Sequence, residues 1–197
     1  SDEQALAAIL ANHHADEGGR LARDLLTRHR HFSRVLSASH AAHTRTVGAA
    51  SATDIKIAAD AGRRVLEADL SAGQELRRSK VLADYLMVSL KGRATEVFRV
   101  LWVDADMRLI ADETLWEGTV DFTPVLAREV YRRALEIGAH GSFLVHNHPS
   151  NGPDPSRNDI SQTQELVDGL KLLGVRVYDH LIVANRTVTS MTAQGLI

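Results

Sequence analysis

Cysteine is absent from this sequence of 197 residues. Its absence excludes disulfide bonds, thiolate metal sites and mechanisms with a cysteine nucleophile. It also excludes the zinc nucleobase deaminases, which take two metal ligands from a Pro-Cys-x-x-Cys motif. The chain also lacks an apolar run of membrane-spanning length and a secretory leader, so we expect a cytoplasmic protein without a membrane segment.

Neither sign of charge dominates the chain. The formal net charge is −2 and the pI is about 6.5, so we expect no overall electrostatic attraction to nucleic acid. The first 73 residues are neutral, with nine Lys or Arg and nine Asp or Glu. These counts disfavour DNA as a partner of the N-terminal part, unless its arginines gather on one side.

The N-terminal part, residues 1–72, is predicted to be a small all-helical domain. Apolar residues recur there at helical spacing in several segments, and short polar stretches, among them residues 44–48, separate these segments. The predicted helices cover residues 5–11, 21–27, 32–36 and 55–66.

The C-terminal part, residues 73–197, is predicted to be an α/β domain with a mixed β-sheet flanked by helices. Helices are expected over residues 79–90 and 124–137, the second with Thr123 as N-cap and Pro124 at its first position. A tight turn at residues 104–107 predicts a hairpin. The expected strands cover residues 95–103, 109–111, 141–145, 175–177, 181–184 and 188–191.

Two histidines, His146 and His148, follow an apolar run that predicts a buried strand. Alternation along a strand sends both imidazoles to the same side. Ser156 and Asp159 follow at a fixed distance. Two imidazoles, one carboxylate and one open position are typical of a catalytic zinc site, in which the metal activates a water molecule. The pattern therefore predicts a metal-dependent hydrolase.

Ser156 and Asp159 also have a purely structural interpretation. They form a Ser-x-x-Asp capping box, which predicts a helix that runs to about residue 173 and is closed by Gly174. The two interpretations are compatible, because a carboxylate in the first turn of this helix can reach back toward the strand that carries the histidines.

The spacing His-x-His, seven residues, Ser, two residues, Asp matches the signature of the JAMM, or MPN+, metalloproteases. The longer segment His-Asn-His-Pro-Ser-Asn-Gly-Pro-Asp-Pro-Ser resembles the bacterial RadC-like branch of this family, and the resemblance extends from about Glu96 to the C-terminus. It implies a cytidine deaminase-like α/β fold in which His146, His148 and Asp159 bind Zn²⁺. It further implies that Ser156 helps to stabilise an oxyanion and that Glu96 is the general acid/base.

The helical part resembles the domain that precedes the catalytic domain in RadC-like proteins, where a helix-hairpin-helix element is expected. The Gly-apolar-Gly turn of that element binds phosphate through backbone N–H groups. Here the turn falls on Thr46-Val47-Gly48, where threonine replaces the first glycine. The hairpin is therefore degenerate, which further disfavours DNA binding.

Several glutamates lie upstream of the histidines, so the assignment of the catalytic carboxylate rests on position. Glu96 precedes a predicted core strand, which can place it near the end of a neighbouring strand. Glu113 and Glu117 remain alternatives if Glu96 lies too far away. Glu129 and Glu136 fall on the helix predicted over residues 124–137 and are expected to be solvated.

Together, these features predict a zinc-dependent metallopeptidase or isopeptidase whose substrate is a peptide or protein, isopeptide-linked and ubiquitin-like substrates included. The alternative is a DNA-repair or recombination accessory protein that binds DNA through its helical part. A third hypothesis is a metal-binding module without hydrolytic activity. His180 is expected to support the site rather than to bind the metal, because catalysis needs an open coordination position.

Overall fold

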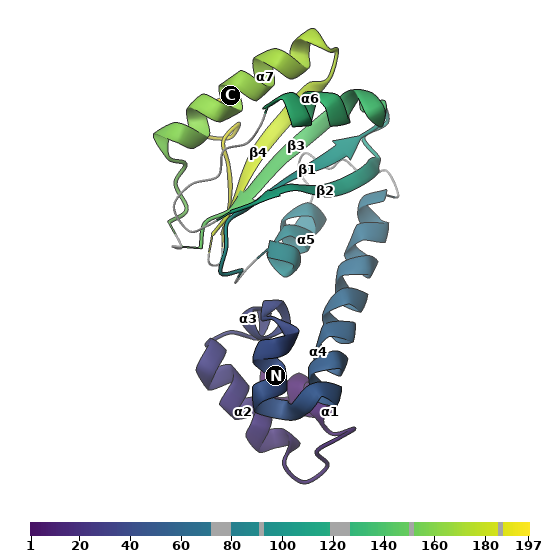
Figure 1. Cartoon of the computed structure of the whole chain (residues 1–197), viewed down its shortest axis with the longest axis vertical. Helices are drawn as coiled ribbons and strands as arrows, with labels where there is room; N and C mark the ends of the chain where they lie inside the picture. The colour runs from purple at the N-terminus through teal and green to yellow at the C-terminus, as the bar shows by residue number, and fades with distance from the viewer. Residues whose placement is uncertain (72–79, 91–92, 119–126, 150–151, 185–186) are drawn as a thin grey trace.

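The computed structural model describes residues 1–71, 80–90, 93–118, 127–149, 152–184 and 187–197. Figure 1 shows a helical N-terminal part joined to an α/β part. The helices are α1 (Asp2–Leu10), α2 (Gly18–His29), α3 (Phe32–Ser37), α4 (His40–Ser71), α5 (Lys80–Leu90), α6 (Ala127–Glu136) and α7 (Arg157–Leu172). The strands are β1 (Val97–Val103), β2 (Leu109–Glu117), β3 (Gly141–Asn147), β4 (Arg176–Ala184) and β5 (Thr187–Ser190).

Helices α1 to α3 and the first half of α4 pack around a common apolar core, as predicted for the N-terminal part. This core consists of Leu6, Leu10, Leu21, Ala22, Leu25, Val35, Val47 and Ile55. The polar break predicted over residues 44–48 is reduced to a kink at Gly48, where φ is 80° and ψ is 164°. Residues 44–47 stay helical because Val47 packs into the core, and glycine adopts the positive φ without a steric clash.

Helix α4 continues beyond this core to the α/β part, where Leu66 and Leu70 pack against the sheet cluster that also contains Tyr85 of α5. The predicted boundary between residues 72 and 73 lies outside the described residues. No helix among the described residues has the length and apolar character needed to cross a membrane.

The sheet has the strand order β2-β1-β3-β4-β5, in which β3 and β4 are parallel and the other neighbours are antiparallel. The predicted hairpin between β1 and β2 is confirmed. Its turn is held by Asp104, whose Oδ1 accepts hydrogen bonds from the N–H groups of Asp106 and Arg108, both at 2.9 Å. Parallel β3 and β4 require a crossover, which α7 supplies.

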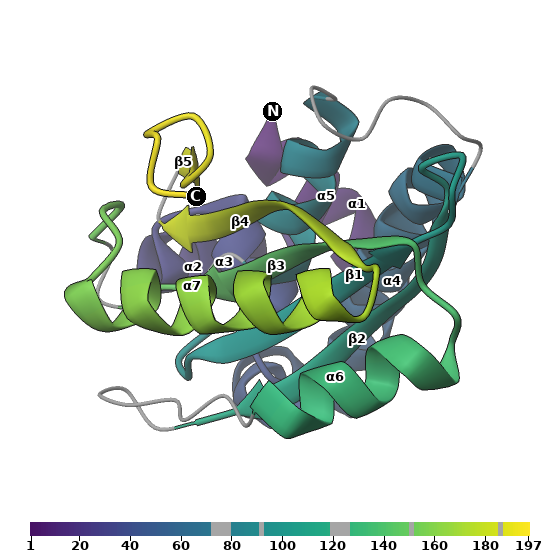
Figure 2. The ribbon, with the colours of Figure 1, turned by 90° about the horizontal axis from the view of Figure 1, so that it is seen from above.

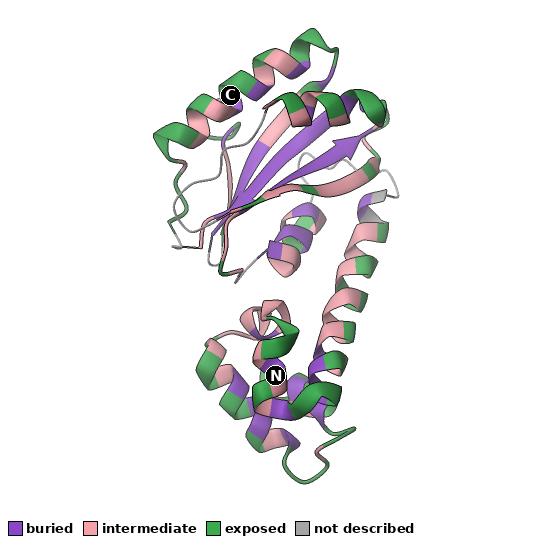
Figure 3. Cartoon of the chain, in the orientation of Figure 1, coloured by how far each residue is buried: buried purple, intermediate pink, exposed green. Residues whose placement is uncertain are grey.

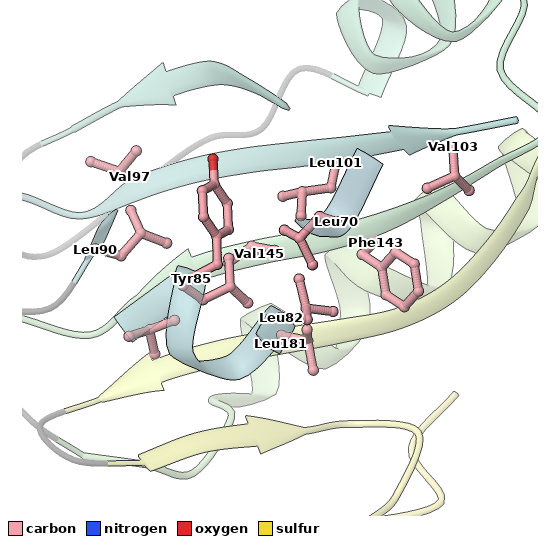
Figure 4. Close-up of a cluster of buried hydrophobic side chains, with 12 residues drawn as sticks. Leu70, Leu82, Tyr85, Leu90, Val97, Leu101, Val103, Phe143, Val145 and Leu181 are labelled. Atoms are coloured by element: carbon pink, nitrogen blue, oxygen red, sulfur yellow. The ribbon is translucent and has the colours of Figure 1, made fainter. Parts of the chain in front are cut away.

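Helices α6 and α7 cover one face of the sheet, while α5 and the end of α4 cover the other (Figures 1 and 2). Figure 4 shows the cluster on the α5 face, which includes Tyr85, Leu101 and Phe143. The central strands are buried along their whole length, as Figure 3 shows. This three-layer arrangement confirms the predicted α/β fold with a mixed sheet between helices.

Two sequence-based boundaries need comment. The strands predicted separately over residues 175–177 and 181–184 are one strand, β4, because pairing with β3 resumes after an irregularity at Tyr178: Asp179 lies opposite Phe143, and His180 opposite Leu144. Helix α6 is described from Ala127 onward, and the predicted cap at residues 123–124 lies outside the described residues.

Candidate metal centre

Strand β3 and helix α7 bring the three predicted metal ligands together. His146 lies near the end of β3, is 2% exposed, and faces the α6–α7 side together with Leu144, two residues earlier. His148 follows the strand directly, and Asp159 lies in the first turn of α7. One potential ligand atom of each residue lies within 4.8 Å of the others.

A chain of hydrogen bonds assigns the tautomer of His146. Thr163 Oγ1 donates its hydrogen to the carbonyl oxygen of Asp159 at 2.5 Å, so it accepts the Nδ1–H of His180, also at 2.5 Å. The Nε2 of His180 is therefore an acceptor, and the Nδ1–H of His146 donates to it at 2.7 Å. The lone pair of His146 Nε2 is left to face the cluster.

A single hydrogen bond assigns the same tautomer to His148. Its Nδ1–H donates to the carbonyl oxygen of Gly152 at 2.7 Å, and a carbonyl can only accept. When the ring is neutral, the Nε2 lone pair of His148 therefore faces that of His146, with 2.8 Å between the two nitrogens. Two opposed lone pairs repel each other, and a proton or a metal cation between the two nitrogens removes that repulsion.

The distances from Asp159 agree with metal coordination. The Nε2 atoms of His146 and His148 lie 3.5 Å from Oδ1 and Oδ2 of Asp159, respectively. An ion about 2.0–2.1 Å from tetrahedral ligands separates those ligands by about 3.3 Å. The carboxylate is already at this separation, and the two imidazoles need to part by about half an ångström.

Burial and charge set the protonation of the cluster. Burial lowers the pKa of His146 to about 4 and that of His180 well below its usual value, so both rings stay neutral near pH 7. Burial alone would raise the pKa of Asp159, but the proximity of His148 and His146 and the hydrogen bonds with Ser156 hold it well below its usual range. The nearby Asp159 carboxylate raises the pKa of His148, with a smaller contribution from Glu96. The site therefore combines a carboxylate with imidazoles that can act as neutral ligands.

Glu96 lies just before β1, next to the histidine pair. The antiparallel register places Phe98 opposite His146, and Glu96, two residues before Phe98, lies close enough to His148 to raise its pKa. Asn147 fixes this end of the strand, because its Oδ1 accepts the N–H of Val97 at 2.9 Å and its Nδ2 donates to the carbonyl of Thr95 at 3.0 Å. Glu96 is thus held at the rim of the cluster.

The alternative carboxylates have other partners. Glu113 lies on β2, with β1 between it and β3, and accepts hydrogen bonds from Arg133 and from the Trp102 indole, the latter at 3.2 Å. The side chain of Arg133 lowers the pKa of Glu113. Glu117, at the end of β2, accepts a hydrogen bond from Thr95 Oγ1 at 2.8 Å. Glu129 and Glu136 pair with Arg132 on the exposed face of α6.

Ser156 is the N-cap of α7, so the predicted capping box is confirmed. Its Oγ accepts the N–H of Asp159 at 3.1 Å, and its own N–H donates to Asp159 Oδ2 at 2.7 Å. This bond uses the hydroxyl as an acceptor and leaves its hydrogen for another partner. The cap also holds the Asp159 carboxylate against the histidines.

Two residues of the site were not predicted from the sequence. Asn147 stands between the histidines and points to the opposite face of β3, so strand alternation separates it from them. Thr163 lies four residues after Asp159, one helical turn further on. That spacing is a signal for a shared helix face, but the contact of Thr163 with His180 depends on how α7 packs against β4.

A five-stranded mixed sheet with helices on both faces, and with two imidazoles and a carboxylate at one strand end, defines an α/β domain of the JAB/MPN class. The RadC-like JAB domain family matches residues 76–196. A UPF0758 protein of Ruegeria pomeroyi is 41% identical over 177 residues, covering 89% of this chain and 79% of the relative. A UPF0758 protein of Rhodobacter capsulatus is 39% identical over 179 residues, covering 90% and 84%. The chain belongs to the RadC-like JAB family.

Proposed function

We propose that this protein is a zinc-dependent amide hydrolase, a metallopeptidase or isopeptidase. The observation that carries the proposal is the convergence of two Nε2 lone pairs and the Asp159 carboxylate on one point. Two imidazoles and one carboxylate leave a fourth position open, which is the arrangement of catalytic rather than structural zinc sites. Membership of the RadC-like JAB family supports a metal-dependent hydrolase.

When bound, zinc supplies a Lewis acid that activates water and polarises the scissile carbonyl. Glu96 accepts a proton from the attacking water and delivers it to the leaving amine. The Ser156 hydroxyl donates a hydrogen bond to the carbonyl oxygen as negative charge develops there. His180 and Thr163 keep His146 in the tautomer that presents Nε2.

Two measurements test the proposal. Elemental analysis at near-neutral pH without chelator should find about one zinc ion per wild-type chain and none in the His146→Ala/His148→Ala/Asp159→Ala variant. Assays on peptide and isopeptide substrates should then show that Glu96→Gln keeps its metal but loses turnover by about 100-fold or more. Equal, near-zero metal in both proteins after incubation with zinc would overturn the proposal.

A further inference from the structure

A cleft of about 1010 Å³ lies between the helical part and the α/β part and ends at the candidate metal centre. One wall comprises the end of α2, α3 and the middle of α4, and the other comprises the end of α5 and the strand ends. Figure 1 shows where α3 and α5 approach each other. Because His148 lines the cleft, a chain that lies in it reaches the metal ligands.

The cleft is strongly cationic, although the chain as a whole is not. Six basic side chains line it, against two carboxylates, Asp60 and Glu117. Both carboxylates are already paired, Asp60 with Arg63 at 2.8 Å and Glu117 with Arg93 at 3.5 Å. The basic residues are Arg28, Arg30, Arg34, Lys56, Arg63 and Arg93. An anionic ligand would compensate the excess positive charge.

The cationic side chain of Lys56 lines this cleft. Its Nζ donates to the backbone carbonyls of Leu36 at 3.0 Å and of Ala38 at 3.3 Å, and its side chain is partly buried. In the described part of the chain no carboxylate forms an ion pair with it. Burial lowers the pKa of Lys56, and the nearby Arg93 lowers it further. An ammonium has three donors, so one remains for an anion.

The other lining residues favour a peptide over a single-stranded nucleic acid. Proteins that bind single-stranded nucleic acid stack the bases on aromatic side chains, and none of the described residues that line this cleft is Phe, Tyr or Trp. Aliphatic residues also line the cleft, among them Leu36, Val88 and Val183. We propose that the cleft binds an extended acidic peptide segment of the substrate and leads it to His148. This inference rests on the proposed amide hydrolase function.

The test uses the full chain and fluorescence anisotropy. The probes are a labelled peptide rich in Asp and Glu, the same peptide with Asn and Gln in their place, and an oligothymidine. The acidic peptide should bind about tenfold more tightly than its amide counterpart, and the difference should shrink with added salt. Lys56→Met and Arg30→Gln should each weaken acidic-peptide binding about fivefold. Lys171→Gln, an exposed control on α7 that removes the same charge, should leave it unchanged.

The readout separates this inference from the proposed function. Binding of the acidic peptide should persist in Asp159→Asn, which impairs the metal site, so a failure of hydrolysis alone leaves the cleft assignment intact. Equal affinity for the acidic and amide peptides would overturn the inference, even if metal and turnover are found. It would equally be overturned if oligothymidine bound more tightly than the acidic peptide, or if Lys171→Gln had the same effect as Lys56→Met. Circular dichroism of each variant verifies that the fold is retained.

Discussion

At the scale of single residues, the site depends on which ring nitrogen carries a proton. An imidazole binds a metal through an unprotonated nitrogen, and the partner of the other nitrogen selects that state. In this protein His180 selects it for His146, and the carbonyl of Gly152 selects it for His148. His180 therefore supports the site through the second ring nitrogen of His146.

Replacement of Thr163 tests this relay. Thr163→Val keeps the shape of the side chain but removes the oxygen that accepts the His180 Nδ1–H. Because the orientation of His146 is then unsupported, zinc affinity should fall about 10–100-fold. Thr163→Ser restores the oxygen and should bind zinc like the wild type, as measured by competition with a chelating dye. Equal affinities of the valine and serine variants would contradict the relay.

The buried imidazole of His146 should make the metal-free protein less stable in acid. Burial lowers its folded-state pKa to about 4, whereas an unfolded histidine titrates near pH ~6.5. Between these pH values His146 is protonated in the unfolded chain and neutral in the native chain. Protonation therefore favours the unfolded state, and the stabilisation that is present above the unfolded pKa is lost as the pH falls toward 4. We expect His146 to contribute a loss of about 2 kcal/mol between about pH 7 and about pH 5.

Urea unfolding of the chelator-treated protein at the two pH values measures this contribution. His146→Gln should show the smaller pH dependence, because its amide does not titrate. If the wild type and this variant lost the same unfolding free energy on acidification, His146 would not be the source of the effect.

At the scale of secondary structure elements, a buried ion pair ties β1 to β2 and both to α5. The Nε of Arg99 on β1 donates to Asp112 Oδ1 on β2 at 2.9 Å, and the Tyr85 hydroxyl of α5 also donates to Asp112. The two charged side chains are 10% and 3% exposed. This network aligns β1, the strand that directly follows Glu96.

Asp112→Ala should destabilise the protein by about 3–5 kcal/mol, because it leaves the Arg99 guanidinium buried without its carboxylate. Tyr85→Phe removes one hydrogen bond from the same carboxylate and should cost about 1 kcal/mol. Denaturant unfolding of the two variants beside the wild type gives both values. A loss below about 1 kcal/mol for Asp112→Ala would show that water replaces the carboxylate.

At the scale of the whole molecule, the candidate metal ligands lie on two elements, β3 and α7, that a loop separates in the chain. An ion held by both β3 and α7 binds the folded state alone, so zinc should stabilise the protein against unfolding. At a free zinc concentration of 100 times the dissociation constant, the free energy of unfolding should rise by about 2.7 kcal/mol. This rise corresponds to a Tm increase of about 5–10 °C for a chain of this size. Thermal unfolding with and without zinc measures it. A similar increase in the His148→Ala/Asp159→Ala variant would place the zinc elsewhere.

The same scale explains how a helical part without net charge contributes to a cationic surface. Its nine basic and nine acidic residues cancel along the chain, yet α2, α3 and α4 present Arg28, Arg30, Arg34 and Lys56 to one cleft. The net charge of a segment does not depend on where its charged side chains point, whereas the packing of the helices determines which side chains share a surface.

Local patterns in the sequence determined those features of the protein that depend only on residues close together in the chain. Alternation along a strand puts His146 and His148 on one face, and a capping box starts α7 with Asp159 in its first turn. The central strands were also predictable, because apolar runs between turn residues must be buried. These features depend on the spacing of residues along the chain, which the sequence shows directly.

Only the tertiary structure decided what depends on which elements are neighbours. The strand order β2-β1-β3 places the start of β1, with Glu96, beside His148, while Glu113 lies one strand further away with Arg133. The contact of Thr163 with His180 and the cationic cleft likewise join segments distant in the chain. Such proximities follow from the pairing of strands and the packing of helices over the whole core, which no local pattern encodes.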